Sequence, residues 1–230
     1  MTPDFIAQTF ARLISALPVT LEVWFLSIFF GGIIAVGVTW MRASRSTALA
    51  AVARGYIFVF RGSPLLIQLF VIYYGLPSLP FVRHSFLWPF LRDAFFCAVL
   101  SLALCTAAYT SEIFRGALAA VPRDQVEAAR ACGMSGFLLL RRIILPIAMR
   151  QALPAYATEV ISMTKATALV SLVTLWDMMN VALKIRNDTL VTYTPLIIAG
   201  AIYFVLNLII ARFFAWLERR VSPHLRPRGH

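Results

Sequence analysis

The sequence predicts an all-α polytopic membrane protein with five transmembrane helices, on three observations. First, the 230 residues are 60% hydrophobic and only 13% charged, with a mean hydropathy of +0.81. Soluble domains are about 45–50% apolar, so this composition excludes an ordinary soluble domain. Second, the apolar residues form five runs that reach the roughly 20 residues needed to cross a bilayer. Third, the basic residues, which give a net charge of +11, stand at the ends of those runs. Membrane topology therefore explains them better than nucleic-acid binding does.

The five expected spans belong to one membrane domain, residues 1–230. Their approximate bounds are 18–41, 55–74, 93–115, 144–173 and 194–216. A short amphipathic segment, Met1–Leu17, precedes the first span and is expected to lie in the membrane interface. Pro146 and Pro154 are expected to break the fourth span. A polar, partly helical loop should separate the last two spans, and a basic, frayed tail, Leu217–His230, should end the chain.

The distribution of basic residues predicts the orientation. One side carries fourteen arginines, in the loop after the first span, in the segment between the third and fourth spans, and in the tail. The other side carries five Lys or Arg residues. Because cytoplasmic loops are enriched in Lys and Arg, we expect a periplasmic N terminus and a cytoplasmic C terminus.

The long polar segment Val121–Pro146 predicts a short helix held outside the membrane between two spans. Pro122 suits a helix start, and acidic residues follow near the positive end of the helix dipole. Residues 123–132 would form this helix, and Gly133 would end it in the left-handed conformation. Ser135 would then cap a second helix that continues into apolar sequence.

The same segment resembles the EAA loop of ABC-importer permeases. The matching residues are Glu127-Ala128-Ala129, then Gly133 after three residues, Ile143 after nine more, and Leu145-Pro146 after one more. The resemblance implies the type I ABC-importer permease fold. It also implies that residues 121–146 hold a coupling helix that docks into a groove of a cytoplasmic ATPase, with Ala128 and Ala129 facing that groove. The alternative is an amphipathic surface helix with no partner.

Three further stretches are similar to signatures of polar amino-acid permeases. They are 60–69 (FRGSPLLIQL), 108–116 (AYTSEIFRG) and 159–169 (EVISMTKATAL). The closest patterns are permeases for histidine, for lysine/arginine/ornithine and for opines. The resemblance implies a bacterial inner-membrane location, a second permease that is identical or homologous, a dimer of cytoplasmic ATPases, and a periplasmic solute-binding protein.

The chain is not expected to be an enzyme or to hold a cofactor of its own. Its only lysines are Lys165 and Lys184, and neither follows a glycine-rich phosphate-binding loop. ATP and Mg²⁺ would therefore belong to a separate ATPase subunit. The three cysteines lack metal-ligand spacing, and Cys97 and Cys105, eight residues apart on one face of a predicted span, are expected to serve packing. No His pair, Ser/Lys dyad or Asp pair has a setting that suggests catalysis or a metal site.

Ionisable side chains inside the spans provide the candidate substrate site. Such groups cost about 2.5–3.5 kcal/mol or more at the membrane centre, so they face a bundle interior or an aqueous cavity. Glu159, Ser162 and Lys165 follow one another along the fourth span, and Arg61 adjoins a predicted helix break at Gly62-Ser63-Pro64. Glu159 would bind an ammonium or guanidinium group, Lys165 would bind a carboxylate, and Pro154 would open the helix beside them.

Two alternatives stay open for these residues. Glu159 or Lys165 could form an interhelical salt bridge with Arg61 or with the partner permease. Arg61 could hold the helix bend rather than line the path. Glu112 and Arg115, three residues apart, are expected to form a structural pair.

We therefore expect the permease subunit of an ATP-driven importer for polar or basic amino acids or opines, working by alternating access. The rival class is a ligand-gated helical-bundle channel without ATP coupling. ATP-dependent accumulation of substrate in proteoliposomes separates the two.

Overall fold

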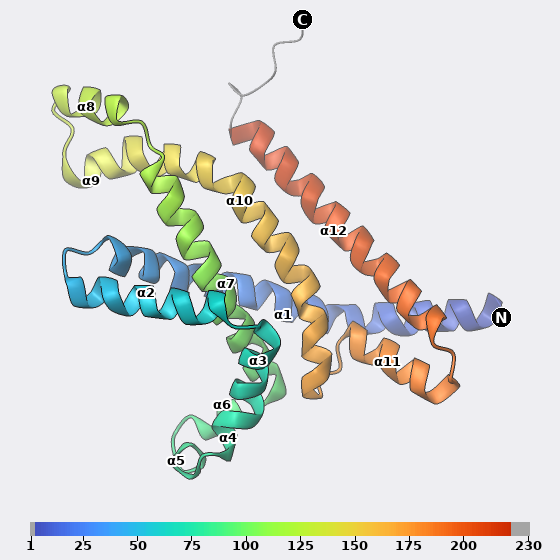
Figure 1. Ribbon diagram of the computed structural model, residues 1–230. Helices are drawn as coiled ribbons and strands as arrows, with labels where there is room; N and C mark the ends of the chain where they lie inside the picture. The colour runs from blue at the N-terminus through green and yellow to red at the C-terminus, as the bar shows by residue number, and fades with distance from the viewer. Residues whose placement is uncertain (1–2, 222–230) are drawn as a thin grey trace, which may run out of the picture.

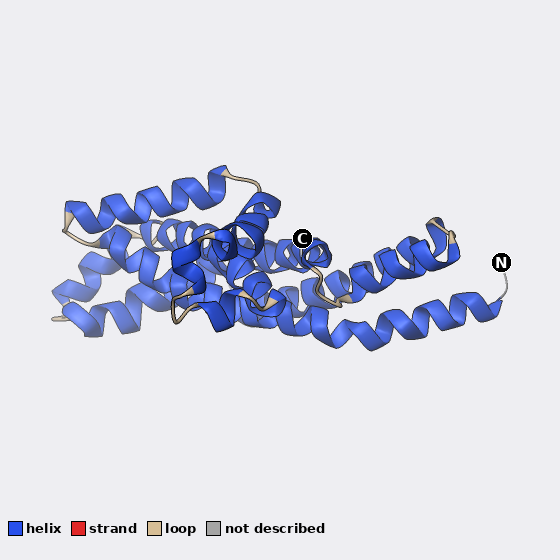
Figure 2. Ribbon diagram, turned by 90° about the horizontal axis from the view of Figure 1, so that it is seen from below, coloured by secondary structure: helices blue, strands red, loops and turns tan. Residues whose placement is uncertain are grey.

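The computed structural model describes residues 3–221, which fold entirely into helices joined by turns and loops (Figures 1 and 2). The long helix α1 (Pro3–Ala43) runs across the middle of Figure 1, where α7 (Ala94–Ala119) and α10 (Leu145–Ala166) cross it, and α12 (Tyr193–Val221) rises from near its N-terminal part. Three of these helices are long and apolar enough to cross a membrane, and counting two bent helix pairs as spans raises the number to five. This count agrees with the predicted all-α membrane fold.

A single 41-residue helix, α1, replaces the expected interfacial segment and first span. Its buried residues recur every three or four positions along the whole length: Thr9, Leu13, Ala16, Thr20, Val23, Ser27, Gly31, Ala35, Val38 and Thr39. Residues 3–17 therefore form the first turns of α1 rather than a separate helix, and their place in the membrane interface stays a prediction. One continuous seam packs against α7 and α11 (Met178–Thr189), so Pro18 does not interrupt the helix.

The second apolar run is broken where the sequence predicted a break. Helix α2 (Thr47–Gly62) ends before Ser63-Pro64, and α3 (Leu65–Phe70) leaves at a bend of 106°. The buried side chain of Gln68 spans the break. Its amide nitrogen donates to the carbonyl oxygens of Phe60 at 2.8 Å and Ser63 at 3.1 Å. Carbonyl groups at a helix end need such partners, so Gln68 helps to stabilise the bend.

Two Leu-Pro pairs each follow a short widened helical turn. A π-turn, η1 (Val71–Gly75), precedes Leu76-Pro77 and leads into α4 (Leu76–Ser78). A second, η2 (Leu140–Ile144), precedes Leu145-Pro146 and joins α9 (Gly136–Leu139) to α10. In each case the leucine N–H bonds to the carbonyl five residues earlier. The wider turn accommodates a proline that cannot donate a hydrogen bond and whose ring crowds the preceding turn.

Helix α10 continues through both of its prolines, which corrects the expected breaks at Pro146 and Pro154. Pro146 occupies the first turn, where its missing N–H is tolerated. Pro154 lies inside the helix, and its own carbonyl accepts a hydrogen bond of 3.2 Å from the Thr158 hydroxyl. The expected opening of the helix at Pro154 is therefore absent. The run ends in a 3₁₀ turn, η3 (Thr167–Val173).

The connections between spans carry short helices. After α4, two single-turn helices, α5 (Pro80–Arg83) and α6 (Trp88–Leu91), lead to α7. Helix α11 accounts for the predicted partly helical loop, and the buried carboxylate of Asp177 caps it by accepting from two backbone N–H groups. Helix α12 extends to Val221, past the predicted start of the tail, and residues 222–230 lie outside the described part.

Helix α7 is the centre of the bundle. Its buried positions are mostly small: Cys97, Ala98, Ser101, Ala103, Cys105, Ala107, Ala108 and Ser111 are among them. Small side chains let helix backbones approach closely in a membrane, where close packing takes the place of the hydrophobic effect. At the crossing with α1, a Cβ added to Gly31 would overlap Thr106 Cγ2 and lie 3.0 Å from the Ala103 carbonyl oxygen. The two cysteines serve packing, as predicted.

Candidate functional site

Glu159 lies within the bundle on the face of α10 that meets α7. The Thr106 hydroxyl donates a hydrogen bond of 2.8 Å to Glu159 Oε1. Thr106 is buried and is held from its other side by the close approach of Gly31 on α1. The position of the Glu159 carboxylate is thus set by a chain of contacts across three helices. The sequence did not predict Thr106 as a site residue. A threonine in a helix of small residues does not indicate which residue of another helix its hydroxyl will bond.

Arg61 occupies the last turn of α2, beside the predicted break. Its guanidinium lies 5.1 Å from the ring centroid of Tyr109 on α7, a cation–π contact. From this position Arg61 interacts electrostatically with Glu159 and with Glu112. Arg61 therefore adds positive charge in the neighbourhood of both carboxylates, and among residues 3–221 it forms an ion pair with neither.

Ser162 and Lys165 lie on another stripe of α10. Gln151, Ala155, Thr158, Ser162 and Lys165 are all exposed and alternate at intervals of four and three residues, which places them on one helix face. Glu159 lies beside this stripe, on the side of α10 that reaches α7. The four predicted residues thus form two groups, with Glu159 and Arg61 in the bundle and Ser162 and Lys165 on an open polar face.

The salt-bridge alternative for Glu159 and Lys165 has no support within residues 3–221. The ion pairs found among these residues all involve Glu112. Its carboxylate accepts from Arg115 Nε at 2.9 Å and from Nη2 at 2.8 Å, which confirms the predicted pair. Arg42 at the end of α1 lies 3.7 Å from the other carboxylate oxygen.

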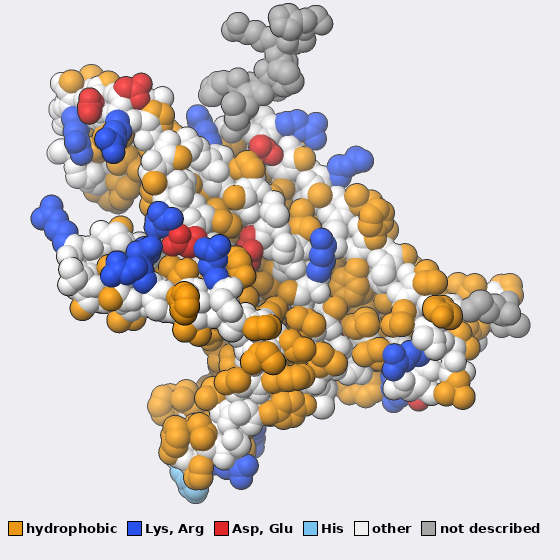
Figure 3. All heavy atoms as spheres, in the orientation of Figure 1, with side chains coloured by type: hydrophobic (Ala, Val, Ile, Leu, Met, Phe, Trp, Pro, Cys, Tyr) orange, Lys and Arg blue, Asp and Glu red, His pale blue; other side chains and the backbone are white. Residues whose placement is uncertain are grey.

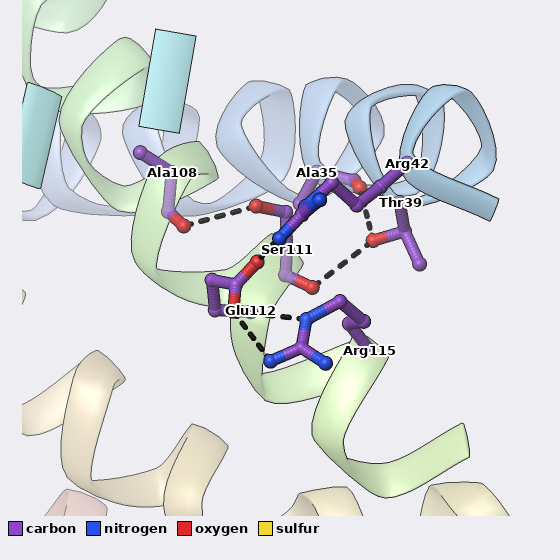
Figure 4. Close-up of polar contacts among 7 residues, drawn as sticks. All are labelled: Ala35, Thr39, Arg42, Ala108, Ser111, Glu112 and Arg115. Carbon is purple, nitrogen blue, oxygen red and sulfur yellow. Dashed lines mark hydrogen bonds and ion pairs between the residues drawn. The ribbon is translucent and has the colours of Figure 1, made fainter. Parts of the chain in front are cut away.

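Figure 4 shows how this group joins α1 to α7. Arg42 and Arg115 approach Glu112 from two sides, and the Thr39 hydroxyl bonds to the carbonyl oxygens of Ala35 and Ser111. Sequence reasoning counted Arg42 only as a topology signal. Its role as a partner of Glu112 depends on the packing of α1 against α7, two helices far apart in the chain that run in the same direction.

The predicted external helix is α8 (Arg123–Ala131), which projects from the end of the bundle in Figure 1. Gly133 has a φ of +81°, and its N–H bonds to the Arg130 carbonyl at 2.9 Å. The next N–H, of Met134, bonds to the Ala129 carbonyl at 3.0 Å. This pair of bonds is the Schellman motif, and it confirms that Gly133 ends the helix in the left-handed conformation. Ser135 precedes α9 but its side chain makes no capping bond.

Surface exposure corrects one expectation about α8. Glu127 and Ala128 are exposed, whereas Ala129 is only 7% exposed and packs within the chain. Ala129 therefore cannot face a partner together with Ala128. Leu145, 44% exposed, and Pro146 follow the widened turn η2, which contacts α8 and connects it to α10.

These features define a class of protein: a helical membrane protein with charged groups inside its bundle and a rigidly terminated helix outside it. Residues 27–223 match the family described as the inner membrane component of binding-protein-dependent transport systems. The chain belongs to this family, and it is a permease subunit rather than a catalytic one.

Individual relatives agree over nearly the whole chain. The octopine transport system permease protein of Rhizobium radiobacter is 50% identical over 224 residues, covering 97% of this chain and 91% of the relative. The histidine/lysine/arginine/ornithine transport system permease protein of Escherichia coli K12 is 39% identical over 91% of this chain and 88% of its own. A crystal structure of an amino acid ABC transporter with histidines matches with a TM-score of 0.84 and 36% identity, covering 96% of this chain and all of the other. The predicted importer-permease fold is confirmed.

Proposed function

We propose that this permease imports an amino acid or opine with a cationic side chain, and that Glu159 binds that cation within the membrane. The family and the names of the relatives support the substrate class. The observation that carries the site is the Thr106–Glu159 hydrogen bond of 2.8 Å, which fixes a carboxylate inside an apolar bundle without an ion-pair partner there. Such a carboxylate is costly unless it faces a cavity or meets a charge.

The other predicted site residues would contribute at two places, Arg61 near Glu159 and Ser162 with Lys165 on the exposed stripe of α10. Arg61 supplies positive charge near Glu159 and suits the carboxylate of the same substrate. Ser162 and Lys165 line the exposed stripe of α10, which is too polar to face lipid. We assign that stripe to the wall shared with the second permease, where Lys165 would meet a substrate carboxylate or a residue of the partner. Glu159 and Lys165 are separated by a rise of about 9 Å along α10.

The sides on which the partner proteins would bind are inferred from the positions of the helix ends. In Figure 1, α8 and the C-terminal end of α12 lie toward the same side, opposite α4, α5 and α6. We place the former side in the cytoplasm. There α8 would dock on an ATPase through Glu127 and Ala128, while Gly133, Leu145 and Pro146 hold it against α10. ATP and Mg²⁺ would bind to that ATPase, and a periplasmic binding protein would deliver substrate opposite.

The test is Glu159→Gln in the complete complex reconstituted in proteoliposomes, with arginine and octopine as substrates. Loss of a charge-assisted hydrogen bond, about 1.5–3 kcal/mol, should raise the substrate concentration for half-maximal uptake roughly ten- to hundred-fold. Glu22→Gln, an exposed carboxylate on α1, is the matched control and should behave as wild type. Normal uptake by Glu159→Gln, or loss of ATPase copurification, would refute the substrate role. Uptake that needs no ATP would favour the channel class.

A further inference from the structure

A hollow of about 440 Å³ lies between α1, α2 and α7, adjoining the proposed substrate site at Arg61 but otherwise separate from it. We call it the arginine pocket. Its charged and aromatic lining consists of Arg42, Arg54, Phe58, Arg61, Tyr109 and Glu112. In Figure 3, basic and acidic side chains gather over α2 and the middle of this face, between apolar surfaces. The volume falls in the range of roughly 300–1,000 Å³ typical of small-ligand sites.

The charges of the arginine pocket are unbalanced. Its one carboxylate, Glu112, is already engaged by Arg115 and lies 3.7 Å from Arg42. Within residues 3–221, Arg54 and Arg61 have no carboxylate at ion-pair distance. The pocket therefore presents two guanidinium groups that still lack an anion. A planar guanidinium group can donate two parallel N–H hydrogen bonds to the two oxygens of a carboxylate. Among the groups of an amino acid, the carboxylate is therefore the best ligand for these arginines.

The charge of these two arginines restricts the ligand. Arg54 and Arg61 are seven residues apart on α2, so they share a face of the helix and line the same pocket. One carboxylate carries a single negative charge and would leave one of the two guanidinium groups without an anion. A ligand with two carboxylates on separate arms can supply an anion to each. Arg61 also interacts electrostatically with Glu159, so the pocket adjoins the proposed substrate site.

We propose that the arginine pocket is a second substrate site, which receives the carboxylate groups of the substrate between Glu159 and the side that carries α8. The inference rests on the proposed function. An opine, an amino acid whose nitrogen bears a second carboxylate-bearing arm, can engage Arg54 and Arg61 together. A simple amino acid supplies one carboxylate and balances the charge of only one of them. The pocket thus favours opines over the parent amino acids.

The test measures protection of a thiol in the pocket. Phe58 lines the pocket and is 79% exposed, so Phe58→Cys provides a reporter. Native Cys132 is exposed and is replaced by serine, while Cys97 and Cys105 are buried. In the purified permease–ATPase complex without nucleotide, saturating octopine should slow labelling of Phe58→Cys at least several-fold, and more than arginine does. Val52 lies on α2 outside the pocket and is 62% exposed. Val52→Cys should therefore be labelled at the same rate with octopine, with arginine and without ligand.

Substitution of Arg54 then tests whether its guanidinium group binds the ligand. Arg54→Gln should reduce protection by octopine to the level seen with arginine, whereas Arg45→Gln, in the preceding loop, should change nothing. This pattern supports the arginine pocket whether or not Glu159→Gln alters uptake. Equal labelling of Phe58→Cys with and without octopine overturns it, even if Glu159→Gln lowers uptake. If Arg54→Gln does not assemble, the comparison of octopine with arginine on Phe58→Cys alone decides.

Discussion

Thr106 on α7 donates its hydroxyl hydrogen to Glu159 on α10, 53 residues further along the chain, at 2.8 Å. The bond ties the membrane-embedded carboxylate to the central helix of the bundle. Because Thr106 also fills the space left by Gly31 on α1, three helices share one contact point. Substitutions at this point can therefore test packing and substrate response separately.

Replacing Thr106 by valine keeps the shape of the side chain but removes the donor. We expect Thr106→Val to leave the complex assembled and to weaken uptake of a cationic substrate less than Glu159→Gln does. Because Thr106 acts on the substrate only by positioning Glu159, we expect a loss of roughly two- to tenfold, equivalent to about 0.5–1.5 kcal/mol, the net contribution of a typical hydrogen bond. Concentration-dependent uptake in proteoliposomes measures this. Thr106→Ser, which retains the hydroxyl, should restore most of the response, and equal defects in both variants would contradict the proposed role.

Gly31→Ala should separate α1 from α7. The new Cβ would overlap Thr106 Cγ2 and approach the Ala103 carbonyl oxygen, and a backbone atom cannot move aside as a flexible side chain can. Overpacking of this kind costs about 1–3 kcal/mol. A lower thermal stability of the purified complex, followed by size-exclusion chromatography after heating, would show it. The adjacent Gly32→Ala meets nothing within 4 Å and should be neutral; a similar loss there would rule out the steric explanation.

Gly133→Asp should weaken the link between the permease and its ATPase. A residue with a Cβ pays roughly 1–2 kcal/mol in the left-handed region, and the added carboxylate meets the negative end of α8. We expect the variant to reach the membrane but to copurify with less ATPase. Gly116→Ala near the end of α7 has open space around its Cβ and serves as the control. Full recovery of ATPase with Gly133→Asp would disprove the coupling assignment.

Native Cys132 provides a direct test of orientation. It is exposed directly after α8, whereas Cys97 and Cys105 are buried. In intact cells an impermeant thiol reagent should leave Cys132 unmodified and should label it after the membrane is opened. A cysteine placed at the exposed Asp188 of α11, in a Cys132→Ser background, should show the opposite pattern. Labelling of Cys132 from outside would reverse the proposed topology.

Local features of the chain were predictable because neighbouring residues determine them. Gly133 ends α8 because a left-handed residue is needed directly after the helix, and Ser63-Pro64 ends α2 because proline lacks an N–H and restricts the residue before it. The predicted pair of Glu112 and Arg115 formed for the same reason, since residues three apart on a helix are neighbours. The apolar runs likewise predicted a membrane bundle.

The tertiary structure alone decided how distant segments meet. The sequence could place Glu159 inside the membrane, but only the crossing of α7 and α10 brought Thr106 to it. The same holds for Arg42 at Glu112 and for the burial of Ala129, since each depends on which helix faces which. The continuity of α1 past Pro18 and of α10 past Pro154 also follows from packing. A helix that packs against its neighbours stays helical at a proline that removes one backbone hydrogen bond. Local helix propensities do not include this tertiary packing, so the sequence alone did not predict it.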